Sequence, residues 1–290
     1  MNKVSIIAIL SAVFYGISIP FSKIMLIKGV NPMVLGGLTY LGAGFGLLLF
    51  SLMKSFKKER IFQNPLGKKE FPYAVLMVFF DIFAILFLMY GLSKTNSANA
   101  SLLSNFEIVS TSIIAFIFFK EKISKKLWFA IILIIIASII LTYEGSTCLD
   151  FTFGSVFVLC AYLFWGMENN CTKMISSKNI FETTIIKGVC SGIGSLIIAY
   201  FAKCEIPAFN LIFAILIMGL FSYGISVLMY IYSQNKLGAA KTASYFSYAP
   251  YIGIFASIII LKELPNFHFL IAFIIMLFAG CLIYKDNKND

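Results

Sequence analysis

Ten apolar runs of near-membrane-spanning length follow one another along this chain, separated by short polar segments. A transmembrane helix needs about 20 apolar residues to cross the hydrocarbon core of a bilayer, where it satisfies its own backbone hydrogen bonds. The pattern therefore predicts an all-α membrane protein with ten transmembrane helices. The expected spans are residues 4–27, 32–53, 71–92, 97–119, 126–143, 153–175, 181–202, 210–233, 238–260 and 266–284.

The composition agrees with a chain that is dissolved in lipid. Of the 290 residues, 60% are hydrophobic and only 12% are charged, whereas a soluble domain has about 25% charged residues. A single water-soluble core of this size could not bury so many apolar side chains. The first run follows Lys3 in the manner of a signal peptide, but it is too long and is polar along one face, so we interpret it as a membrane helix.

The basic residues predict the orientation. If the N-terminus is cytosolic, the outer side receives only Lys23, Lys28, Lys94, Lys203 and Lys262, and every other Lys and Arg residue falls on the cytosolic side. This asymmetry places both termini in the cytosol. The net charge of +10 then belongs to short loops that face anionic lipid, rather than to a nucleic-acid surface. We expect a multi-pass protein of the cell (plasma or inner) membrane.

The sequence offers little for catalysis or metal binding. It has one histidine, His268, six scattered cysteines, and no CxxC, HExxH or GxSxG motif. We therefore predict no catalytic residue, no metal site and no cofactor. An intramembrane aspartyl pair would require Asp81 and Glu107 to approach closely. Cys148 and Cys204 both fall in expected outer loops, where they either form a disulfide or stay as two unpaired thiols.

Parts of the first half recur in the second half. Phe14-Tyr15-Gly16 recurs as Phe164-Trp165-Gly166, and Lys120-Glu121 recurs as Lys262-Glu263. We therefore divide the chain into two five-helix repeats, residues 1–145 and 146–290. Because each repeat has an odd number of spans, the second is inverted relative to the first, an arrangement found in secondary transporters.

The order and duplication of these features resemble the ten-helix EamA-type branch of the drug/metabolite transporter superfamily, along essentially the whole chain. The resemblance is carried by the aromatic-glycine pairs that open each half, by small residues that open the fourth and ninth spans, and by the Lys-Glu pairs that follow those spans. The residues are Tyr15-Gly16, Trp165-Gly166, Ser97-Ala98-Asn99-Ala100, Gly238-Ala239-Ala240, Glu121 and Glu263. The resemblance implies a cavity lined by helices one, three, four, six, eight and nine. It also implies a cargo among amino acids, other metabolites, sugars, quaternary amines and drugs.

Polar and aromatic side chains recur at helical spacing within the spans. Ser11, Tyr15, Ser18 and Ser22 form one stripe on the first span. Hydroxyl stripes also join helices to one another, but Tyr and Trp inside a span favour contact with a ligand. The predicted substrate-binding residues are Tyr15, Ser18, Trp165, Glu168, Asn169, Tyr223 and Tyr248.

Three carboxyl groups lie within spans, at Asp81, Glu107 and Glu168. A charge at membrane depth must face a partner or a wet cavity. We name these residues and Lys187 as candidates for proton or charge coupling, with Glu168 and Lys187 as an ion pair that is either structural or part of a gate. Asp81 or Glu107 could carry a proton, or the carboxylates could anchor a cationic solute with help from aromatic rings. For Asp81, a structural hydrogen bond is a further alternative.

Glycine and proline predict how the helices pack and bend. The triplet Gly42-x-Gly44-x-Gly46 and the pair Gly188-x-x-x-Gly192 allow close crossing of helices, within one chain or between two copies. Pro20 and Pro250 fall inside expected spans, as hinges or as static kinks.

These features predict a secondary-active transporter of a small organic metabolite, such as an amino acid or an amine. It would work by alternating access, coupled to protons or to exchange. The alternative is a channel, or a structural or receptor protein that transports nothing. We expect a small-molecule solute and membrane lipid as partners, no nucleic acid, and a monomer or homodimer.

Overall fold

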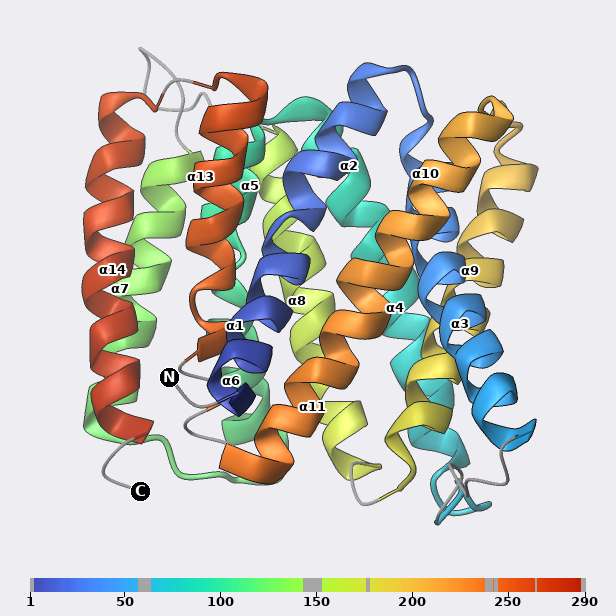
Figure 1. Cartoon of the computed structure of the whole chain (residues 1–290). Coiled ribbons are helices and arrows are strands. Elements are labelled where there is room, and N and C mark those ends of the chain that lie inside the picture. Colours follow the sequence, from blue (N-terminus) through green and yellow to red (C-terminus); the bar gives the residue numbers. More distant parts are fainter. Residues whose placement is uncertain are drawn as a thin grey trace.

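The computed structural model describes residues 3–56, 64–142, 153–175, 178–237, 242, 245–263 and 265–287, and these residues form helices and no strand (Figure 1). The chain is therefore all-helical in the part described, as predicted. In order, the helices are α1 Lys3–Gly16, α2 Ser18–Ile27, α3 Pro32–Phe56, α4 Phe71–Lys94, α5 Ser97–Leu103, α6 Phe106–Phe119, α7 Lys125–Thr142, α8 Phe153–Met174, α9 Ile180–Phe201, α10 Phe209–Gly219, η1 Leu220–Ile225, α11 Ser226–Leu237, α13 Ala249–Leu261 and α14 Phe267–Asn287.

Within the described residues, eight helical stretches are long and apolar enough to cross a membrane. They are Lys3–Ile27, Pro32–Leu52, Phe71–Lys94, Ser97–Phe119, Lys125–Thr142, Phe181–Phe201, Phe209–Gln234 and Phe267–Asp286. α13 is a shorter apolar helix, and α8 has 22 residues but carries Glu168 and two asparagines. The chain is thus a multi-pass membrane protein, while the total of ten spans and the side on which the termini lie stay predictions.

Three of the apolar stretches are interrupted near their middle. Between α1 and α2 the interruption falls at Ile17, and Pro20 lacks the N–H that would bond to the Gly16 carbonyl. Between α5 and α6, Ser104 N–H bonds to Ser101 O at 3.4 Å, one residue short of the α-helical spacing. Between α10 and α11, residues 220–225 form a π-helical turn, η1. Interrupted helices expose backbone polar groups only where they face protein or a wet cavity.

Pro250 has a different position from the one predicted. It lies in the first turn of α13, which begins at Ala249, and not inside a continuous helix. A proline in the first turn removes no intrahelical hydrogen bond, because the N–H groups there have no helical acceptor. The prediction that Pro250 bends the interior of a span is therefore wrong.

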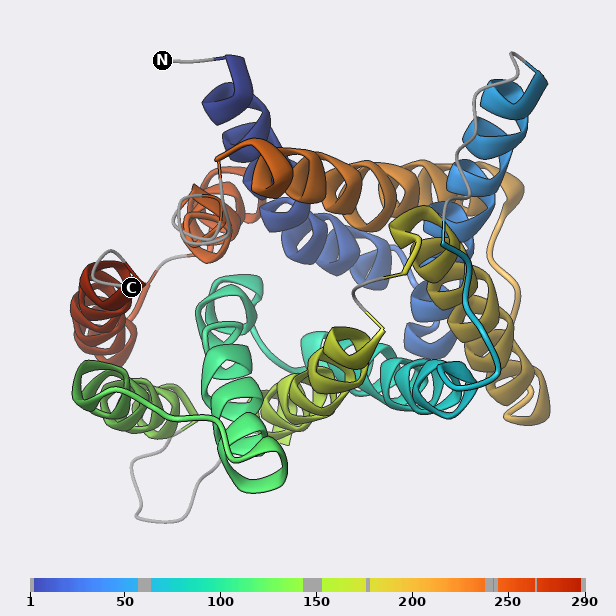
Figure 2. The same ribbon diagram turned by 90° about the horizontal axis from the view of Figure 1, so that it is seen from below.

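The first and second halves of the chain interlock through pairs of helices (Figures 1 and 2). The main pairs are α3 with α9, α4 with α8, α1 with α11, α5 with α13, and α7 with α14. Each pair takes one helix from residues 1–145 and one from residues 146–290. The core of the bundle is therefore an interface between the two halves.

Glycine sets the distance between α3 and α9. A Cβ atom on Gly188 would lie 2.6 Å from the Gly44 Cα atom, and a Cβ atom on Gly192 would lie 2.7 Å from the Leu41 nitrogen. These glycines therefore pack helices within one chain, one of the two packing modes predicted for them. Close backbone approach supplies the van der Waals contact that holds membrane helices together.

We expect Gly188→Ala to destabilise the protein by about 1–3 kcal/mol, because the added methyl group forces α3 and α9 apart. The measurement is the melting temperature of the detergent-solubilised protein. Gly280→Ala is the matched control, since the nearest atom to its added Cβ would be the Tyr251 hydroxyl at 3.4 Å. Equal melting temperatures for the two variants would contradict this account of the interface.

Candidate functional site

A cavity of about 400 Å³ lies between α1, α3, α6, α8, α9, η1 and α11, within the usual size range of small-molecule sites. Its aromatic lining consists of Tyr15, Tyr40, Trp165, Tyr223, Tyr230 and Phe246. Its polar lining includes Glu107, Glu168, Asn169, Thr172, Thr183, Thr184, Lys187 and Gln234. Both halves of the chain therefore supply the wall.

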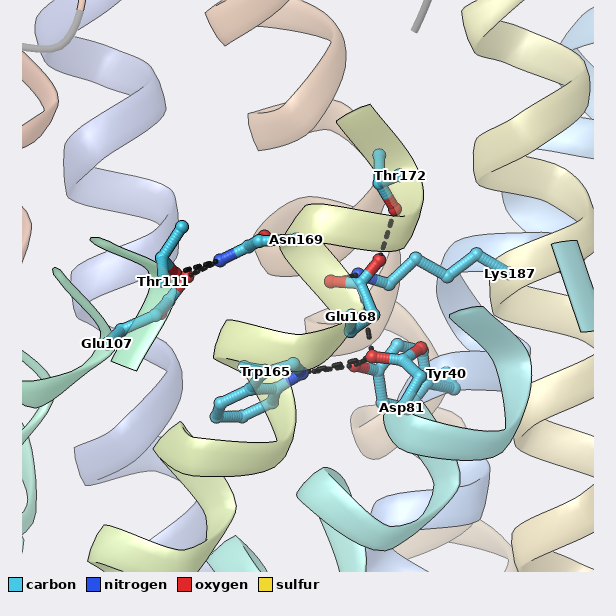
Figure 3. Close-up of polar contacts among 9 residues, drawn as sticks. All are labelled: Tyr40, Asp81, Glu107, Thr111, Trp165, Glu168, Asn169, Thr172 and Lys187. Atoms are coloured by element: carbon cyan, nitrogen blue, oxygen red, sulfur yellow. Dashed lines mark hydrogen bonds and ion pairs between the residues drawn. The ribbon is translucent and has the colours of Figure 1, made fainter. Parts of the chain in front are cut away.

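Lys187 on α9 is the centre of the charged part of this wall (Figure 3). Its Nζ atom lies 3.1 Å from Glu168 Oε2 and 3.4 Å from Asp81 Oδ1. One ammonium group thus joins α4, α8 and α9 through two buried carboxylates. The contact expected between Glu168 and Lys187 is present, and Asp81 joins it.

Asp81 is fully buried behind the cavity wall. Its Oδ1 atom accepts hydrogen bonds from the Tyr40 hydroxyl at 2.6 Å and from Trp165 Nε1 at 3.0 Å. The Asp81 carboxylate therefore orients two rings that line the cavity. A fixed position for these rings matters because recognition requires side chains whose rotamers are locked.

Glu107 is held in a different way. It lies in the first turn of α6, where the partial positive charge of the helix end favours a carboxylate. Glu107 Oε1 accepts a hydrogen bond from Asn169 Nδ2 at 2.7 Å, and the same amide nitrogen lies 3.3 Å from Thr111 Oγ1 (Figure 3). Among the described residues, no Lys or Arg side chain forms a salt bridge with Glu107.

The aromatic side of the cavity is a continuous set of rings. Tyr15 lies 5.2 Å from Phe246 and 5.7 Å from Tyr223 between ring centroids, and Tyr230 lies 5.0 Å from Phe246. Tyr223 belongs to the π-helical turn η1. Such turns are common at functional sites because they re-aim side chains.

Most of the predicted site residues come together here. Tyr15, Trp165, Glu168, Asn169, Tyr223, Glu107 and Lys187 line the cavity. Ser18 is buried behind the lining, against the Tyr223 phenol. Tyr248 does not reach the cavity, and its side chain is 55% exposed. Ser11, from the polar stripe, instead joins α1 to α11, because its hydroxyl donates to the Ser226 carbonyl at 2.9 Å.

Two lining residues, Tyr40 and Phe246, were not among those predicted from the sequence. Tyr40 lies within the apolar second span without a polar stripe around it, so helical periodicity gave no reason to select it. The only signal was a tyrosine far from either end of a span, where membrane helices seldom place one. Phe246 is one of 31 phenylalanines, and only its position in space marks it.

The two ends of the bundle differ. The cavity lining extends to Ile175, beyond the end of α8, and to Gln234 near the end of α11. Both of these helices end at the lower side of the bundle in Figure 1. At the opposite end, Glu263 accepts hydrogen bonds from the backbone N–H groups of Ser97 at 2.9 Å and Ala98 at 2.8 Å. Lys23 donates to carbonyls at the end of α4, those of Leu92 and Thr95, at 2.8 Å each. We call the Glu263 contacts with Ser97 and Ala98 the latch.

Other predictions concern cysteines and metal ions. Cys148 lies outside the described residues, so its pairing with Cys204 is not tested. The Cys204 Sγ atom lies 4.0 Å from Met33 Sδ. In the described part of the chain, no group of three or more His, Cys, Asp or Glu side chains could hold a metal ion.

Comparison with known proteins assigns the family. The profile of the EamA-like transporter family matches residues 2–143 and again residues 152–285. A protein named "Uncharacterized transporter" from Methanothermobacter thermautotrophicus is 28% identical, over 97% of this chain and 85% of its own. Another of that name, from Buchnera aphidicola, is 26% identical over 91% of this chain and 88% of its own. These names indicate a transporter rather than an enzyme.

A solved crystal structure has the same fold, with a TM-score of 0.70 at 11% identity over 99% of this chain and 98% of that one. Likeness at this level of identity concerns the fold alone. The family match covers nearly the whole chain, and the helices enclose a cavity between the two matched segments. The chain is therefore a membrane transporter that belongs to the EamA-like transporter family.

Proposed function

We propose that this protein is a secondary-active transporter that moves a small organic metabolite across the cell membrane by alternating access. The observation that carries the proposal is the cavity of about 400 Å³. It lies inside a bundle of membrane-spanning helices and combines aromatic rings with charged side chains. Such a cavity suits a solute that must leave water on one side and re-enter it on the other.

The proposal includes two inverted repeats, residues 1–145 and 146–290, that rock against each other. The family profile matches once in each repeat, which supports the division. The helix pairs support it too, because α3 pairs with α9, α5 with α13 and α7 with α14, as a pseudo-two-fold axis between the repeats requires. Movement of one repeat against the other would open the cavity alternately to each side.

The latch is the part of this mechanism that must open. Glu263 follows α13, in the second repeat, whereas Ser97 and Ala98 begin α5, in the first. The Ser97 hydroxyl also lies 2.8 Å from the Ser257 hydroxyl. Opening the cavity at this end therefore requires these contacts to break. The latch holds the protein in the state in which the cavity reaches the other end.

We expect Glu263→Gln to increase access to the latch end about 5- to 30-fold, because it removes a charge-assisted contact worth about 1–2 kcal/mol. The measurement is labelling of a Ser22→Cys reporter, buried beside Lys23, by a membrane-impermeant maleimide. The chain without the reporter gives the background. Glu205→Gln is the control, because Glu205 is exposed between α9 and α10. Unchanged labelling in Glu263→Gln would show that the latch does not close this end.

The test of transport is solute counterflow in proteoliposomes that contain the purified protein. A transporter exchanges labelled external solute for unlabelled internal solute, whereas a channel gives flux without exchange and a receptor gives no flux. Solutes to test come from a thermal-shift screen of amino acids, amines, nucleosides and sugars. The proposal fails if a solute that stabilises the protein shows no counterflow.

A further inference from the structure

Glu107 has no cationic partner among the described residues, although it faces the cavity. The other carboxylates near the cavity, Asp81 and Glu168, share the single ammonium group of Lys187. Among the residues that the structure describes, the Glu107 carboxylate accepts a hydrogen bond only from the Asn169 amide. Among the described residues, the wall of the cavity and the layer directly behind it therefore carry three carboxyl groups, Glu107 and Glu168 in the wall and Asp81 behind it, against the one basic side chain of Lys187. This is an excess of acid at membrane depth.

This excess negative charge must be balanced by something other than the described side chains of the wall. A carboxylate at this depth is stabilised by a proton, by water or by a cation that enters the cavity. Lys187 cannot supply the missing charge, because two carboxylates already hold its Nζ atom within 3.4 Å. Because Lys187 is already paired with two carboxylates, an anionic group on a solute would also find no free basic side chain among the described lining residues.

The rings that line the cavity together with Glu107 suit a cation. Tyr15, Tyr230 and Phe246 pack together with centroid separations of 5.0–5.2 Å and line the cavity with Glu107. An ammonium group between a carboxylate and several ring faces gains both ionic and cation–π attraction.

We propose that the transported solute is an organic amine that carries a positive charge and no carboxylate, and that its ammonium group binds between Glu107 and the rings of Tyr15, Tyr230 and Phe246. Lys187 and Glu168 form a fixed wall of this site, with Asp81 behind them, and these three residues do not bind the solute directly. The inference rests on the proposed function and names the substrate class of the same cavity. It predicts that the site prefers an amine to the amino acid with the same side chain, because the amino acid also carries a carboxylate.

Three ligands with the same phenyl ring test the proposal. Phenethylamine carries only the ammonium group, phenylalanine carries the ammonium and carboxylate groups, and 3-phenylpropanoate carries only the carboxylate. We expect phenethylamine to bind the purified protein at least about 10-fold more tightly than phenylalanine, and 3-phenylpropanoate not to bind. The measurement is isothermal titration calorimetry in detergent. Equal or tighter binding of either carboxylate-bearing ligand would overturn the inference.

Variants of the wall locate the ammonium group. We expect Glu107→Gln to weaken phenethylamine binding about 10- to 100-fold, while its amide oxygen still accepts the hydrogen bond from Asn169 and keeps the fold. Phe246→Ala is expected to weaken binding about 3- to 30-fold, and Phe246→Tyr to restore it, because either ring presents a face to the cation. Glu205→Gln is the control and is expected to bind as the native chain does. Unchanged affinity in Glu107→Gln, with a native melting temperature, would place the amine elsewhere and overturn the assignment.

Counterflow separates a failure of this inference from a failure of the proposed function. If 3-phenylpropanoate or phenylalanine exchanges across the vesicle membrane and phenethylamine does not, the chain is a transporter and the amine assignment is wrong. If phenethylamine binds through Glu107 but shows no exchange, the site assignment holds and the transport proposal fails. Exchange of phenethylamine that is lost in Glu107→Gln supports both.

Discussion

Lys187→Met is expected to destabilise the protein by about 3–5 kcal/mol, the usual cost of removing one partner from a buried ion pair. The substitution would leave Asp81 and Glu168 facing each other without the ammonium group that now lies 3.4 Å and 3.1 Å from them. Methionine is similar in length to lysine, so the loss would come from charge rather than from a void. Detergent-solubilised protein should show a strongly lowered melting temperature and poor yield.

A triple variant tests the cause of this loss. Lys187→Met combined with Asp81→Asn and Glu168→Gln removes the two stranded charges and should recover much of the stability. Lys173→Met is the matched control, because Lys173 forms an exposed ion pair with Glu121, and such pairs contribute little. If the triple variant is no more stable than Lys187→Met alone, the charge cluster is not what Lys187 stabilises.

Asp81→Asn is expected to lower the counterflow rate about 10- to 100-fold while the protein remains folded. The asparagine is almost the same size, but it loses the charge that attracts Lys187 and weakens the bonds from Tyr40 and Trp165. Each charge-assisted hydrogen bond is worth about 1.5–3 kcal/mol. Both rings line the cavity. A loss of their orientation should therefore directly affect their contacts with the solute.

Two further variants separate the contributions to this effect. Tyr40→Phe removes only the hydroxyl that donates to Asp81 at 2.6 Å, and it should reduce counterflow less than Asp81→Asn does. Ser138→Ala is the control for a buried polar group away from the cavity, since its hydroxyl has no hydrogen-bond partner among the described residues, and it should transport normally. Native counterflow in Asp81→Asn would mean that Asp81 does not position the cavity rings.

Several features of the fold followed from the local pattern. The apolar lengths located the helices, because the bilayer fixes how many residues cross it. Gly44 and Gly188 predicted close packing, since only glycine lets two backbones approach so closely. The position of Pro250 was misjudged because an apolar run does not reveal where a helix begins inside it, and the structure begins α13 at Ala249.

The candidate site was predicted only in part, and the misses have a common cause. Tyr15, Trp165 and Glu107 stood out because polar and aromatic groups are rare inside spans. Tyr40 was missed, and Tyr248 was chosen although it points away from the cavity. Helical periodicity describes which side chains share a face of one helix. It does not say toward which neighbour that face turns.

The sequence by itself determined that this chain is a membrane protein, roughly where its helices lie, and that its buried carboxyl groups need partners. These properties depend on local composition, because the bilayer acts on each segment separately. Only the tertiary structure decided which partners they have. Asp81 and Glu168 converge on Lys187, whereas Glu107 lines the cavity with the aromatic rings and has no cationic partner among the described residues. Such pairing depends on how α4, α6, α8 and α9 cross, and helix crossing is set by packing between segments far apart in the chain.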